Sequence, residues 1–84
     1  MNINLELYKV FYYVAKNSSI SRAANEMMIS QPAISKSIKT LEAQVGTSLF
    51  IRKRDGVILS EAGETIYNKI KDAVEKTINQ ASHS

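Results

Sequence analysis

Hydrophobic positions along the chain recur with helical spacing in several segments, which polar or glycine residues separate. The first segment, 5–16, is apolar on two sides of a helical wheel, as expected of a helix that contacts two partners. The polar break that follows offers N-cap residues for a second helix over about 20–28. The cleanest pattern lies in 31–45, where one apolar face opposes a face of small polar and basic residues. Gly46 is expected to end this third helix as a left-handed cap.

The spacing changes to that of extended strands between residues 49 and 60. Two short apolar runs flank Asp55 and Gly56, a dipeptide typical of a tight β-hairpin turn. An isolated hairpin is marginally stable in water, so Phe50 and Leu59 are expected to anchor it to the helices. The pattern therefore predicts a two-stranded wing with a basic edge and tip.

The last segment, 61–84, is expected to form one long helix that Ser60 caps. Its apolar stripe covers roughly 160° of the helical wheel, which is wider than packing on one small body requires. We predict that one flank packs on the body and the other meets a second copy, with help from a spare apolar face of the first helix. The residues predicted at this dimer interface are Leu7, Val10, Val14, Ile66, Ile70, Ala73 and Thr77.

Together these elements predict a mainly α fold, a winged helix-turn-helix with a three-helix body, a two-stranded β wing and a long C-terminal linker helix. A chain of 84 residues is long enough for one small domain with a modest core. We divide it into a winged helix-turn-helix DNA-binding domain over 1–60 and a linker or dimerisation helix over 61–84.

Positive charge is concentrated in the middle of the chain, although the net charge is only +3. Residues 31–54 hold five basic side chains against Glu42 alone, a balance of +4. The other residues hold six basic and seven acidic groups, a balance of −1. A local basic patch is typical of phosphate binding. Charge alone leaves a solvated, randomly charged surface about equally open.

Residue types on the outward face of the third helix match the chemistry of DNA bases and phosphates. Gln pairs with adenine edges, Ser with several bases, and Lys with guanine or phosphate, while Pro contacts a thymine methyl group. The alternative is structural, with serines, Gln and Pro starting helices and the lysines solvated. Glu42 and Arg52 are interpreted as structural. The candidate DNA-binding residues are Ser21, Ser30, Gln31, Pro32, Ser35, Lys36, Lys39, Lys53 and Arg54.

Catalysis and metal binding have little support in the sequence. The chain has no cysteine, one histidine (His83) and no clustered carboxylates, so we expect no enzyme activity, metal or cofactor. No apolar run is long enough to cross a bilayer, and the N-terminus lacks the layout of a signal peptide.

Taken in order, the motifs resemble the N-terminal DNA-binding domain of LysR-type transcriptional regulators. The resemblance covers nearly the whole chain, and its departures are slight, such as Lys36 where the family commonly has Arg. The residues that carry it are Phe11, Ser19 to Ala24, Ser30 to Ser35, Ile38, Leu41, Glu42, Gly46, Leu49, Phe50, Arg52 and Leu59 to Gly63.

The resemblance implies a bacterial, cytoplasmic regulator that binds double-stranded DNA as a homodimer on an interrupted inverted repeat. The helix over 31–45 would enter the major groove, and the wing over 50–60 would reach the flanking minor groove or phosphates. It also implies a C-terminal domain that senses a small-molecule effector, absent from these residues, so we expect the chain to be the DNA-binding part of a longer protein. The alternative is a winged-helix protein–protein interaction module with an incidental basic patch.

Overall fold

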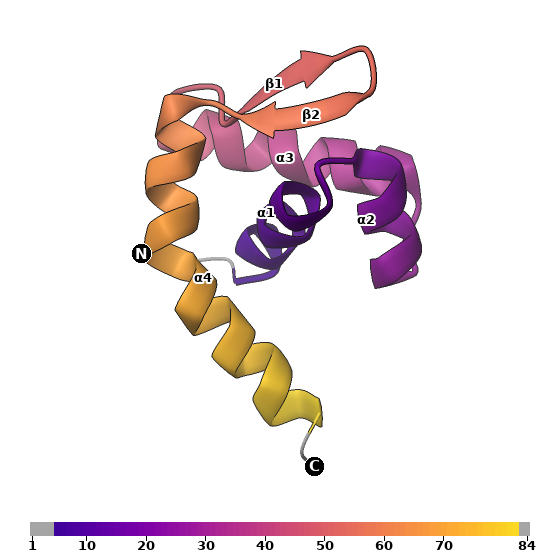
Figure 1. Cartoon of the computed structure of the whole chain (residues 1–84), viewed down its shortest axis with the longest axis vertical. Coiled ribbons are helices and arrows are strands. Elements are labelled where there is room, and N and C mark those ends of the chain that lie inside the picture. Colours follow the sequence, from indigo (N-terminus) through magenta and orange to yellow (C-terminus); the bar gives the residue numbers. More distant parts are fainter. Residues whose placement is uncertain (1–4, 83–84) are drawn as a thin grey trace.

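The computed structural model describes residues 5–82, which form four helices and one antiparallel hairpin (Figure 1). This is the mainly α winged helix-turn-helix fold that the sequence predicts. Figure 1 shows α4 running along the side of the body and continuing past it. The elements in chain order are α1 (Leu5–Asn17), α2 (Ile20–Met27), α3 (Gln31–Val45), β1 (Phe50–Lys53), β2 (Gly56–Leu59) and α4 (Glu61–Ser82).

Capping residues set the limits of α2 and α3. The Oγ atoms of Ser19 and Ser30 accept the backbone N–H three residues further on, at 3.0 and 3.2 Å. These bonds satisfy N–H groups that have no partner inside the helix. Gly46 ends α3 with a φ of 91°, as predicted. Met28 ends α2 with a φ of 61°, a left-handed position that the sequence did not reveal.

The hydrophobic core forms around α1, which contacts α2, α3, α4 and β2. Each of these neighbours contributes at least one apolar side chain to the core. The outward-facing side chains of the wing do not take part in it. Burial of these side chains supplies the main favourable free energy of folding. Those at most 1% exposed are Val10, Phe11, Val14, Ala23, Ile34, Leu41, Leu49 and Val74.

The prediction that α1 keeps an apolar face free for a second copy is wrong. Leu7, Val10 and Val14 are 7%, 1% and 0% exposed, so they present no surface to a second chain. The helical wheel shows two apolar sides, as the sequence indicates. In this small body the neighbouring elements of the same chain cover both of them.

The wing is fixed to the body at its base and near its turn. Phe50 pairs with Leu59 across the two strands, and both side chains pack against the core, which confirms the predicted anchor. The Val57 N–H donates to the Ser18 carbonyl oxygen at 3.1 Å. Gly56 lies so close to the same oxygen that any Cβ atom would collide with it, and its φ of 150° also favours glycine. The wing therefore has a defined position beside α1 and α2.

Candidate nucleic-acid interface

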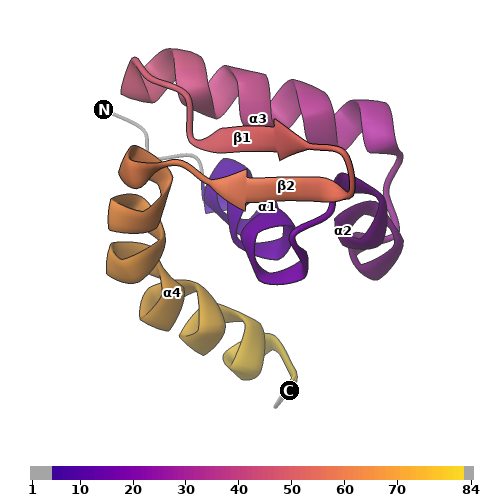
Figure 2. The same ribbon diagram turned by 45° about the horizontal axis from the view of Figure 1, so that its top comes forward.

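The outer face of α3 and the wing lie side by side, and the wing turn lies at the same end of the molecule as the start of α3 (Figure 2). Side chains on this face reach solvent. Ser35 is half-buried, and the other predicted contact residues are exposed: Ser21, Ser30, Gln31, Pro32, Lys36, Lys39, Lys53 and Arg54. Ser30 combines this exposure with its role as the N-cap of α3.

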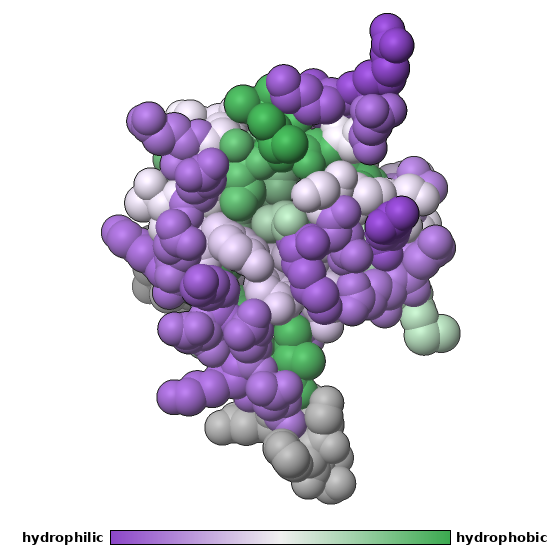
Figure 3. Space-filling model, in the orientation of Figure 1, coloured by the Kyte–Doolittle hydropathy of each residue, from purple (hydrophilic) through white to green (hydrophobic). Residues whose placement is uncertain are grey.

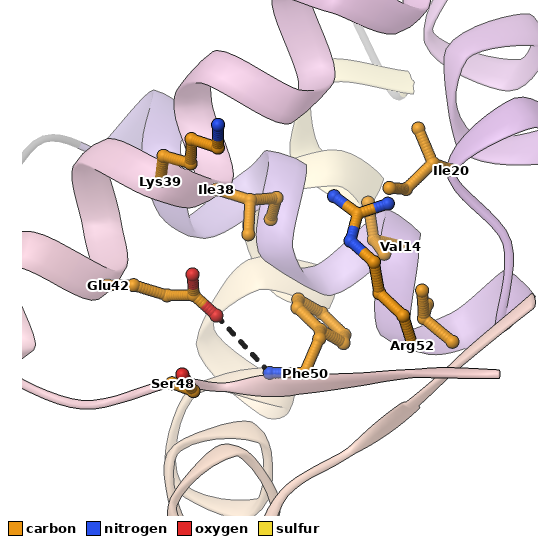
Figure 4. Close-up of a pocket in the computed structure, with 9 residues that line it drawn as sticks. Val14, Ile20, Ile38, Lys39, Glu42, Ser48, Phe50 and Arg52 are labelled. Atoms are coloured by element: carbon orange, nitrogen blue, oxygen red, sulfur yellow. Dashed lines mark hydrogen bonds between the residues drawn. The ribbon is translucent and has the colours of Figure 1, made fainter.

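A hollow of about 200 Å³ separates α3 from the wing (Figure 4). Apolar side chains, including Ile38, line its interior. Lys39 borders it from α3, and the Arg52 side chain rises from β1 on the other side. The hollow therefore combines apolar side chains with two cations and the carboxylate of Glu42 on its walls.

Glu42 borders the same hollow and has a structural role, as the sequence predicts. Its Oε2 atom accepts the backbone N–H of Leu49 at 2.8 Å and that of Phe50 at 3.4 Å. These bonds join α3 to the chain that enters the wing, and Figure 4 shows the bond to Phe50. The carboxylate is thus held on the backbone, where it orients the wing against α3.

A second hollow lies between the start of α2 and the wing, and Ser21, Lys53 and Arg54 border it. Arg52 lines both hollows and so connects the Lys39 side of the site with the wing turn. Strand alternation could have indicated this position, because residue 52 shares a face of the hairpin with Phe50. The sequence interpretation missed Arg52 as a candidate for ligand contact.

The cations of this face are not neutralised by the protein itself. Within residues 5–82, no hydrogen bond or ion pair engages the side-chain nitrogens of the five basic residues of α3 and the wing. Figure 3 shows hydrophilic side chains covering the wing tip and apolar side chains reaching the surface near the wing base. Ile51 and Ile58, a cross-strand pair, are each 46% exposed. The five basic residues are Lys36, Lys39, Arg52, Lys53 and Arg54.

A separate groove of about 360 Å³ runs between the start of α1 and α4, and its lining is almost entirely apolar. It brings together three of the predicted dimer residues, Ile66, Ile70 and Ala73. Thr77 borders a different groove, beside α1 and α2. Two side chains of α1, Leu5 and Tyr8, also line the apolar groove, and neither is among the predicted dimer residues.

The fold, the basic face beside α3 and the basic wing define a winged helix-turn-helix DNA-binding domain. A model of bacterial regulatory helix-turn-helix proteins of the lysR family matches residues 5–64. The chain therefore belongs to the lysR family. Members of this family are transcriptional regulators, which are not a class of enzymes.

Two relatives illustrate the similarity in sequence. The RuBisCO operon transcriptional regulator of Allochromatium vinosum is 41% identical over 68 residues, which are 81% of this chain and 22% of that protein. The HTH-type transcriptional regulator BudR of Klebsiella aerogenes is 46% identical over 65 residues, which are 77% of this chain and 46% of BudR. The chain spans about a quarter of the length of most such relatives, as with 25% of Escherichia coli YcaN.

Solved structures extend the similarity to three dimensions. The DNA-binding domain of CbnR, in complex with DNA, has a TM-score of 0.82 and 26% identity, covering 96% of this chain and 93% of that one. The full-length AphB N100E variant has a TM-score of 0.88 and 25% identity, covering 96% of this chain and 28% of that one. No helix among residues 5–82 is long and apolar enough to cross a membrane. His83 lies outside the described residues.

Proposed function

We propose that this chain binds double-stranded DNA with sequence specificity, as part of a bacterial transcriptional regulator acting in the cytoplasm. One observation carries the proposal. Arg52 lines both the hollow beside α3 and the hollow beside α2, so the unpaired cations of α3 and the wing lie on one continuous face. The ligand that suits such a face is a polyanion with charges spaced along it. The DNA complex of the similar CbnR domain supports the same assignment.

The residues divide by position into base-reading and phosphate-binding sets. Gln31, Pro32, Ser35 and Lys36 lie at the start of α3 and would meet base edges in the major groove. The remaining candidates would hold the DNA backbone and fix the register without reading sequence. This second set consists of Ser21, Ser30, Lys39, Lys53 and Arg54, to which the structure adds Arg52 as a candidate.

The proposed active form is a homodimer through the apolar groove of α4, bound to an interrupted inverted repeat. Leu5, Tyr8 and Ile70 border this groove, which is open to solvent in the single chain. Covering it with a second copy would bury apolar surface and place two recognition helices about one DNA turn, roughly 34 Å, apart. Ile66 and Ala73 would share the interface, with Thr77 at its margin.

We propose a boundary between the DNA-binding part and the dimerisation helix near residue 60. Residues 1–60 would contact DNA, and residues 61–84 would link and dimerise. The relatives are several times longer than this chain, so we infer that any small-molecule effector acts through a domain outside these residues. We propose no cofactor for the chain itself.

A gel-shift titration at several salt concentrations tests the proposal. It compares random DNA with a binding site that the protein has selected from a pool of random sequences. If about six phosphates are contacted, the logarithm of the binding constant falls with the logarithm of salt concentration at a slope of about −5. The selected site is expected to be an inverted repeat. If neither DNA binds at 50 mM salt, the proposal is overturned and the protein-interaction module is favoured.

A further inference from the structure

One tyrosine of α1 contacts α4 through both its hydroxyl group and its ring. The Tyr12 hydroxyl donates a hydrogen bond to Oε2 of Glu75 at 2.9 Å. Its ring stacks on Tyr67, with centroids 5.9 Å apart and planes at 10°. The Tyr12 side chain is only 6% exposed, whereas Glu75 reaches it from an exposed position of α4. The contact is therefore suited to hold α4 in one position against α1.

The other fixed point of α4 lies at its first turn. The Ser60 hydroxyl donates to the Ser48 carbonyl oxygen at 2.7 Å and accepts the Gly63 N–H at 3.0 Å. Glu75 is fourteen residues beyond Glu61, about 21 Å along the helix axis. Two anchors this far apart define the direction of α4 relative to the body.

Three of the proposed dimer residues of α4 lie between these two anchors. Ile66, Ile70 and Ala73 follow the first turn and precede Glu75, on the stretch whose direction the anchors set. The recognition helix α3 belongs to the body, which Tyr12 joins through α1. A change in the angle between α1 and α4 would therefore move the two recognition helices of a dimer relative to each other.

We propose that the Tyr12–Glu75 contact determines which spacing between half-sites the dimer accepts on DNA. This inference rests on the dimeric DNA binding proposed above. Tyr12 and Glu75 are positioning residues, and neither borders the two hollows of the basic face. A tyrosine hydroxyl is protonated at neutral pH even at its ordinary pKa of about 10. Burial and the bond to Glu75 raise the pKa of Tyr12 further, which keeps the hydroxyl a donor.

The test compares binding of the 84-residue chain to selected inverted repeats whose central spacer is shortened or lengthened by one or two base pairs. Tyr12→Phe removes the hydroxyl and keeps the ring, and Glu75→Ala removes the acceptor from an exposed position. Each is expected to reduce the preference for the best spacing over the next by about three- to tenfold. Glu75→Gln keeps an acceptor oxygen and should reduce it less.

Tyr13→Phe is the matched control. Tyr13 is the next residue of α1 and contacts the Tyr12 ring edge-on, with centroids 5.5 Å apart. Within residues 5–82 its hydroxyl makes no hydrogen bond, so its loss should leave the spacing preference unchanged. Binding to an isolated half-site should be equal in all variants, because none of them alters the basic face.

A distance measurement provides a readout without DNA. The chain has no cysteine, so Gln44→Cys on the exposed end of α3 places a single spin label on each copy. Tyr12→Phe should broaden the label-to-label distance distribution in the dimer by electron double resonance. An unchanged distribution together with an unchanged spacing preference would overturn the inference and leave the proposed function intact. A wild-type chain that binds no selected DNA would overturn both.

Discussion

The carboxylate of Glu42 in α3 accepts the backbone N–H of Leu49 at 2.8 Å and so joins the recognition helix to the wing. The Leu49 side chain is 0% exposed, and its N–H lies in a sheltered position. Glu42→Ala leaves this donor without its partner and should lower the free energy of unfolding by about 1–3 kcal/mol. Glu42→Gln keeps an acceptor oxygen and should cost less. Urea denaturation measures both changes.

Gln44→Ala, two residues along the same helix, serves as the control. Gln44 is exposed, so its truncation should change the unfolding free energy by no more than about 0.5 kcal/mol. Equal losses for Glu42→Ala and Gln44→Ala would mean that the bond to Leu49 contributes nothing to stability.

The close approach of α4 to the wing base predicts that Gly63 cannot be replaced. A Cβ atom at this position would collide with the backbone carbonyl oxygen of Leu49, which cannot move aside as a flexible side chain would. Gly63→Ala should therefore cost more than about 2 kcal/mol, as expected for overpacking. At Gly46 a Cβ would meet open space, and the left-handed φ of 91° alone should cost Gly46→Ala about 1 kcal/mol. Thermal unfolding of the two variants tests this order, which a larger loss at Gly46 would contradict.

Local signals in the sequence predicted most of the fold, because caps and turns act over a few residues. Ser30, Gly46 and the turn at Gly56 appear where their side chains or backbone freedom indicate. The partners of α1 could not be predicted in this way. Periodicity shows that a side is apolar and not what covers it, so the buried Val10 was assigned to a dimer surface. Strand alternation places Arg52 on the same face as Phe50, but its place between two hollows depends on how the folded chain brings α2 beside the wing.

Lysines of α3 and the wing should differ in what they contribute to DNA binding. Lys36 lies on the exposed face of the recognition helix and Lys53 at the wing turn. Lys36→Ala should weaken binding to the selected site by about 1–3 kcal/mol and binding to random DNA much less. Lys53→Ala should weaken both similarly and reduce the salt slope by about one. Titrations at two salt concentrations check both, and equal losses on the two DNAs for Lys36→Ala would contradict base contact.

The apolar groove predicts where a new charge should dissociate the dimer. Ala73 is exposed and borders the groove, so Ala73→Glu should leave the fold intact and place a charged carboxylate in a largely apolar interface. Sedimentation should show a monomer at concentrations where the wild-type chain is dimeric. Asn68→Glu adds the same charge to an exposed position of α4 outside the groove and should leave the dimer unchanged. Dimers in both variants would place the interface elsewhere.

The contact between α1 and α2 predicts a small dependence of stability on pH. Asn17 and Lys16 donate hydrogen bonds to Glu26 at 2.9 and 3.1 Å, and these bonds hold the pKa of Glu26 below its usual range. The unfolded chain therefore binds this proton more readily, so the stabilisation is present above pH about 4.3 and is lost as the pH falls through the folded-state pKa. Because the pair is exposed, Glu26→Gln should lower the free energy of unfolding by only a few tenths of a kcal/mol at pH 7. Below the folded-state pKa of Glu26 the variant and the wild-type chain should be about equally stable, and a difference that stays constant as the pH falls would contradict this account.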